Sequence, residues 1–71
     1  MTKEEIRERI NERPFRPFKV RLADGLEMKV PSGDHVHLSP SGRTLFVHVA
    51  RGGTKIIDVA LVTALEARET A

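Results

Sequence analysis

The sequence predicts a small, mostly β domain of the α+β class, in which one N-terminal helix precedes a five-stranded antiparallel barrel. Its 71 residues allow a single domain over residues 1–71. A helix-start pattern opens the chain, and we expect a helix over residues 2–12. From residue 15 to residue 67, short runs alternate at period two between turn residues spaced about 8–12 residues apart, as in small barrels.

Composition excludes several classes of site. The chain has no cysteine, which rules out disulfides and thiolate-bound metals. No apolar run approaches the roughly 18 residues of a membrane span, and no signal-peptide core follows Met1. We therefore expect a cytoplasmic protein with no membrane partner. A core this small leaves little room for a catalytic centre, so we expect neither enzymatic activity nor a cofactor.

The N-terminal helix is predicted from its two ends. Thr2 and Glu5 have the spacing of a capping box, in which each side chain accepts a hydrogen bond from the other residue's backbone amide. Ile6 and Ile10 lie one turn apart and form a thin apolar stripe. Pro14 ends the helix because it lacks an amide hydrogen and restricts the residue before it.

The first hairpin can be predicted down to its register. The first strand alternates at period two, and the turn Ala23-Asp24-Gly25 follows it. A three-residue loop, with glycine in the left-handed position, pairs Val20 with Met28 on the inner face. The same register pairs Arg21 with Glu27 on the outer face, where opposite charges attract.

The second half of the chain contains the remaining strands. Residues 34–38 and 44–49 alternate on either side of the turn at 39–43, where a four-residue loop at 40–43 pairs Leu38 with Leu45. A third hairpin loop follows. The last apolar run, 56–65, suits a strand, a short bend and another strand. A C-terminal helix from Val59 is the alternative, because alanine, leucine and glutamate favour a helix.

Alternation also predicts which side chains form the core and which remain uncovered. Ile56, Val59 and Val62 offer apolar surface that one barrel does not bury. A thin core and a last strand with a free edge predict a homo-oligomer, either a dimer or a ring, formed by strand-edge pairing. The predicted core consists of the inward positions Val20, Leu22, Met28, Val30, Val36, Leu38, Leu45, Val47, Val49, Ile57, Leu61 and Leu65.

The order of one helix and five strands resembles the Sm-like proteins, the group that includes the bacterial RNA chaperone Hfq. Residues 20–25, Val-Arg-Leu-Ala-Asp-Gly, are similar to the Sm strand that ends in Asn-Gly or Asp-Gly. Residues 57–65 are similar to the closing segment, where a short helical turn joins the last two strands. The resemblance implies an Sm/SH3-like barrel. The chain also resembles small uncharacterised bacterial proteins that have an Arg-Pro-Phe-x-Pro-Phe segment leading into the first strand, here residues 13–18. This second resemblance implies no activity.

Charge is concentrated in the middle of the chain. Residues 13–55 carry eight bases against three acids, a net of +5, although the whole chain has a net charge of only +2. Bases can contact phosphates, and phenylalanine can stack on unpaired bases, so weak, sequence-tolerant RNA or single-stranded nucleic-acid binding is one predicted function. The candidate residues are Arg13, Phe15, Arg16, Lys19, Arg21, Lys29, Arg43 and Arg51. The alternative is a protein-interaction or assembly module with no nucleic-acid role.

Three histidines form the one constellation of possible metal ligands. His35 and His37 are two residues apart on a predicted strand, and the predicted register sets His48 opposite His35. Three imidazoles on one face could bind Zn²⁺ or Ni²⁺. Histidines exposed on the outer face of a sheet are the simpler interpretation, so metal binding ranks third among the predicted functions.

Overall fold

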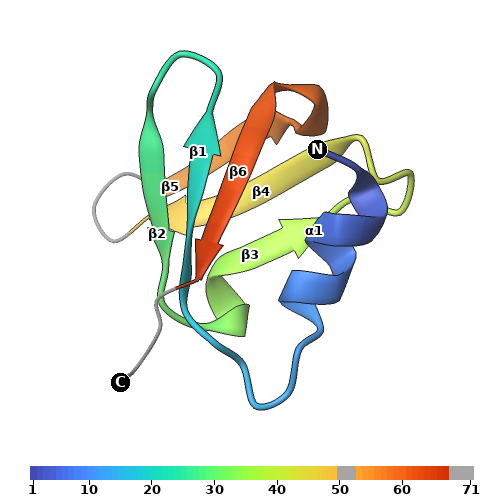
Figure 1. The fold of residues 1–71 in the computed structure, drawn as a ribbon, viewed down its shortest axis with the longest axis vertical. Coiled ribbons are helices and arrows are strands. Elements are labelled where there is room, and N and C mark those ends of the chain that lie inside the picture. Colours follow the sequence, from blue (N-terminus) through green and yellow to red (C-terminus); the bar gives the residue numbers. More distant parts are fainter. Residues whose placement is uncertain (50–52, 68–71) are drawn as a thin grey trace.

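The computed structural model describes residues 1–49 and 53–67 and contains one α-helix and six strands within them (Figure 1). Two short 3-10 helices, η1 (Gly33–His35) and η2 (Val59–Leu61), separate some of the strands. No helix among these residues is long and apolar enough to cross a membrane. The other elements are α1 (Lys3–Ile10), β1 (Phe18–Leu22), β2 (Glu27–Val30), β3 (Val36–Leu38), β4 (Thr44–Val49), β5 (Gly53–Asp58) and β6 (Val62–Ala67).

The strands form two antiparallel sheets and not a closed barrel. One sheet has the order β2-β1-β6 and the other the order β3-β4-β5, and Figure 1 shows them as two crossing layers with α1 beside β3. The α+β class is confirmed, whereas the prediction of a five-stranded closed barrel is wrong. Because η1 separates β2 from β3 and η2 separates β5 from β6, each of these neighbours in sequence joins a different sheet.

Helix α1 begins as predicted and ends earlier than predicted. The Thr2 hydroxyl accepts a hydrogen bond from the Glu5 amide at 3.2 Å, and the Glu5 carboxylate accepts one from the Thr2 amide at 3.1 Å. The helix ends at Ile10, two residues before the predicted end. Ile6 is 1% exposed and packs in the core, and the half-buried Ile10 packs against the same cluster, so these two side chains attach the helix to the sheets.

The predicted register of the first hairpin is confirmed. Val20 lies opposite Met28 and Arg21 opposite Glu27, and the Leu22 amide donates to the Leu26 carbonyl at 2.9 Å. Gly25 has a φ of +92°, so it supplies the left-handed backbone that the three-residue loop requires.

The second sheet follows the predicted pairing with one change. Leu38 lies opposite Leu45, as the four-residue loop requires. The strand predicted over 34–38 contains only β3, because residues 33–35 form η1. The last apolar run is strand, 3-10 turn and strand, which excludes the alternative of a C-terminal helix from Val59 through the described residues.

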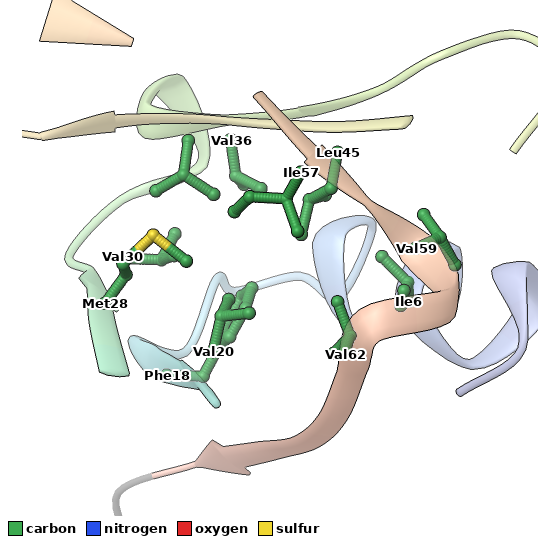
Figure 2. Packing of buried hydrophobic residues seen from close by; sticks show 11 residues of the cluster. Ile6, Phe18, Val20, Met28, Val30, Val36, Leu45, Ile57, Val59 and Val62 are labelled. Atoms are coloured by element: carbon green, nitrogen blue, oxygen red, sulfur yellow. The ribbon is translucent and has the colours of Figure 1, made fainter. Parts of the chain in front are cut away.

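The core lies between the two sheets and is closed at one end by α1 (Figure 2). Most predicted core positions are buried or pack against buried residues. Leu61 is the exception, because η2 turns it outward and leaves it 52% exposed. The same turn buries Val59 and Val62, so the prediction that these two remain uncovered is wrong, whereas Ile56 is 71% exposed as expected.

Candidate functional site

The outer face of the first sheet carries three of the predicted nucleic-acid contacts, Lys19, Arg21 and Lys29. It is defined by Lys19 and Arg21 on β1, Glu27 and Lys29 on β2, and Glu66 on β6, and we call it the charged face. Lys19 lies between Lys29 on one side and Glu66 on the other. Its ammonium is 3.7 Å from a Glu27 carboxylate oxygen. Two acids, Glu27 and Glu66, therefore lie among the three cations of this face, while Lys19 and Lys29 remain direct neighbours of like charge.

Arg21 is the centre of this network. Its guanidinium forms a hydrogen-bonded ion pair with Glu27 and a second ion pair with Glu66 at 3.1 Å. The hydrogen bond from Arg21, and then the charge of Lys19, lowers the pKa of Glu27. The hydrogen bond to Glu27, together with the nearby Glu66 charge, raises the pKa of Arg21. Both groups are exposed, so solvent screens these pairs and each contributes little to stability.

Because the pKa of Glu27 is lowered, the stability that this residue contributes should depend on pH. A carboxyl whose pKa is lower in the folded state adds stability above its unfolded pKa of about 4.3 and loses it as pH falls through the folded value. Glu27→Gln is therefore expected to destabilise the protein slightly near pH 7, and its difference from the wild type should vanish at about pH 2. Urea unfolding at both pH values measures this. If the variant differs from the wild type in free energy of unfolding by the same amount at both pH values, the effect is not electrostatic. Glu8→Gln is the control, because Glu8 is exposed on α1.

Among the predicted contact cations, Arg13, Arg16, Lys29 and Arg43 make no ion pair within residues 1–49 and 53–67. Arg16 is exposed in the segment before β1, and Lys29 is exposed on β2 beside Lys19. Arg16 and Lys29, and also the exposed Arg43, could reach a phosphate without first releasing a carboxylate described by the structure.

Arg13 has a local structural role. Its guanidinium donates hydrogen bonds to the carbonyl oxygens of Ile10 at 3.1 Å and Glu12 at 2.7 Å. Ile10 is the last residue of α1 and Glu12 follows two residues later, so Arg13 lies at the end of the helix where carbonyl groups lack helical partners and a cation is favourable. Arg13 therefore stabilises the end of the helix, and these hydrogen bonds explain the position of its side chain without a bound ligand.

Phe15 packs inward. The side chain is half-buried, rests against the core, and has its ring centroid 5.8 Å from that of Phe18. Gly33 lies beneath the same ring, where a Cβ would be 3.6 Å from a Phe15 ring carbon. The ring therefore fills a gap between the segment before β1 and η1, and it does not stand free as a platform for stacking bases.

The remaining predicted contacts are elsewhere. Arg43 follows the turn before β4 and borders an open depression of about 520 Å³ that Met1, Thr44 and Asp58 also line. This depression belongs to the second sheet, so Arg43 does not join the charged face. Arg51 lies outside the described residues. The predicted cations thus divide among several parts of the surface.

The three histidines do not converge on a metal site. His35 is in η1, where its Nδ1 is 2.8 Å from the Ser32 hydroxyl, and so it does not share a strand with His37 as predicted. His37 and His48 pack edge to face with ring centroids 5.3 Å apart. Nδ1 of His48 is 2.8 Å from the Thr54 hydroxyl. Within residues 1–49 and 53–67, no group of three or more histidine, aspartate or glutamate side chains is placed to hold a metal ion.

The outer face of the second sheet is a feature that the sequence reasoning did not single out. Phe46 on β4 is half-buried at its centre, with His37 on β3 and Ile56 on β5 as direct cross-strand neighbours. His48 and Thr54 form the adjacent row. We call these five residues the Phe46 face. Alternation along 44–49 places Phe46 outward, and this was the available signal.

The two outer faces differ sharply in charge. All five side chains of the charged face are ionisable acids or bases. The Phe46 face contains no acid, lysine or arginine, and on the same side of β5 one acid, Asp58, lies at the end of the strand opposite Thr44. Comparison with protein-family models, with curated proteins and with solved structures finds no match for this chain.

Proposed function

We propose that this protein is a non-enzymatic protein-interaction module that assembles with itself through a free strand edge. The observation that supports this most is the uncovered side of β5 and η2. There Ile56 is 71% exposed and Leu61 52% exposed, and no described strand pairs with β5 opposite β4. Unpaired backbone groups beside exposed apolar side chains form a template for another strand. A cytoplasmic location fits such a module.

The distribution of charge also favours assembly over nucleic-acid binding. A polyanion-binding surface gathers cations on one face, where each phosphate contact releases counterions. Here Glu27 and Glu66 lie beside Lys19 and Arg21 on the neighbouring strands, and Arg43 lies in the turn before β4 of the other sheet. A mixed charged surface of this kind is ordinary for a protein that binds other proteins.

Light scattering tests the assembly proposal. At tens of micromolar protein, the measured mass should be a multiple of 8.0 kDa and should fall on dilution. A mass of one chain throughout that range would contradict the proposal.

Nucleic-acid binding is the second candidate, and the exposed positions of Arg16 and Lys29, with Lys19 next to Lys29, support it. Three phosphate contacts would give a slope of about −2 for log affinity against log salt with single strands. Arg16→Glu with Lys29→Glu should then weaken binding of a labelled uridine-rich oligonucleotide by about tenfold or more. Glu66→Gln should strengthen it, because that change removes an acid from the charged face. No binding at high micromolar protein and low salt, or no response to these changes, would remove this candidate.

A further inference from the structure

Strand β5 is an unusually open edge. It has six residues, and five of them are exposed; only Ile57 points into the core. It contains no proline, so its backbone can pair along its whole length. Its outward side chains are Thr54, Ile56 and Asp58, and its central outward side chain is the most exposed large apolar residue among the described residues.

We propose that two copies of this chain pair β5 with β5 about a two-fold axis centred on Ile56, so that the two sheets continue into one six-stranded sheet. This inference rests on the proposed assembly and specifies which edge is used and in which register. An isologous contact of this kind uses the same patch on both copies and closes as a dimer.

The register follows from which side chains would face each other. A two-fold axis perpendicular to the sheet keeps the outer faces of both copies on the same side. An outward side chain of one copy can therefore lie opposite only an outward side chain of the other copy, so the axis must pass beside a residue and not between two residues. Centring on Lys55 would place two ammonium groups directly opposite each other, which is unfavourable. Centring on Ile57 would place each Ile56 against the carboxylate of Asp58. Centring on Ile56 pairs the two isoleucines and sets the Thr54 hydroxyl opposite the Asp58 carboxylate. On the other side of the strand it sets Lys55 opposite the second copy's Ile57, and the long, exposed Lys55 side chain can keep its ammonium in water.

This pairing also continues a row that each copy already has. Within one copy, His37, Phe46 and Ile56 lie side by side across the second sheet. In the proposed dimer, the row would run on from Ile56 to the second copy's Ile56 and Phe46. The Phe46 face contains no acid, lysine or arginine, so like charges do not oppose this continuation, and the exposed isoleucines become covered.

A single introduced cysteine tests the register. The natural chain has no cysteine, so Ile56→Cys provides one thiol per copy. Directly opposite residues in an antiparallel pair have Cα atoms about 4.5–5.5 Å apart, within the range of a disulfide. The variant should therefore form a covalent dimer under mild oxidation. Thr54→Cys is the matched control, because residues 54 of the two copies would be offset by about 14 Å along the strands and should not cross-link.

A charge variant provides the second readout. Ile56→Lys would place two ammonium groups opposite each other and should raise the dimer dissociation constant by about tenfold or more. Leu26→Lys is the control, since Leu26 is also apolar and exposed, at 47%, but lies beyond the first hairpin loop. Circular dichroism checks that each variant is folded.

The outcomes separate this inference from the proposed function. Cross-linking at residue 56 but not at residue 54, with dissociation by Ile56→Lys alone, would support it. An oligomer that fails to cross-link at residue 56, or that withstands Ile56→Lys, would overturn the β5 register and leave assembly through another edge. A protein that is monomeric at tens of micromolar would overturn both.

Discussion

Leu45→Ala is expected to remove a large part of the protein's stability, about half at the middle of the expected ranges. Leu45 is fully buried in β4, between Leu38 and Ile57 on the neighbouring strands. Truncating a buried leucine to alanine costs about 2–5 kcal/mol, because apolar contacts are lost and a cavity remains. At about 0.05–0.15 kcal/mol per residue, a chain of this length has a free energy of unfolding of roughly 4–10 kcal/mol. The melting temperature should fall by about 10 °C or more.

Urea unfolding and a thermal melt measure this loss, and Leu26→Ala is the matched control. Leu26 is 47% exposed, so the same change there should cost less than about 0.5 kcal/mol. Equal losses at the two positions would contradict the packing described for β4.

Gly42→Ala is expected to have an effect of similar size. Gly42 is buried in the turn before β4 and has a φ of +78°, a conformation that costs other residues about 1–3 kcal/mol. A Cβ at this position would also be 2.7 Å from Cβ of Lys3 and 2.4 Å from its Cδ. Because the first of these atoms is fixed to the backbone of α1, the helix or the turn must shift, and overpacking of this kind adds about 1–3 kcal/mol.

Gly25→Ala separates strain from crowding. Gly25 has a similar φ of +92°, but a Cβ there would meet nothing within 4 Å. Chemical denaturation should therefore show a smaller loss for Gly25→Ala than for Gly42→Ala, and the difference measures the contact between the turn and α1. Equal losses would mean that α1 does not pack on this turn.

Local features of the sequence were sufficient to predict the first hairpin. Its loop length fixes the register, and the pairs Val20–Met28 and Arg21–Glu27 follow directly from the alternation of the strands. The same reasoning placed Leu38 opposite Leu45, because the turn between them has a defined length. Predictions held where a short loop connects two strands that pair with each other.

Predictions failed where strands distant in the sequence come together. The pairing of β6 with β1 brings Glu66 beside Lys19 and Arg21, and no local pattern reports that neighbour. The 3-10 turn η2 exchanges the exposure expected for Leu61 and Val62, since a turn changes which side of the chain faces the core. For this reason the sequence overstated the free positive charge and placed the apolar surface partly on the wrong residues.

Amide hydrogen exchange at two protein concentrations tests most directly whether β5 is the edge used for assembly. Every second amide of an edge strand points away from its partner and exchanges rapidly when that edge is free. If two copies pair through β5, these amides should become protected as concentration rises through tens of micromolar, while the free edge of β2 should stay unchanged. Rapid exchange of the outward β5 amides at both concentrations would contradict the account.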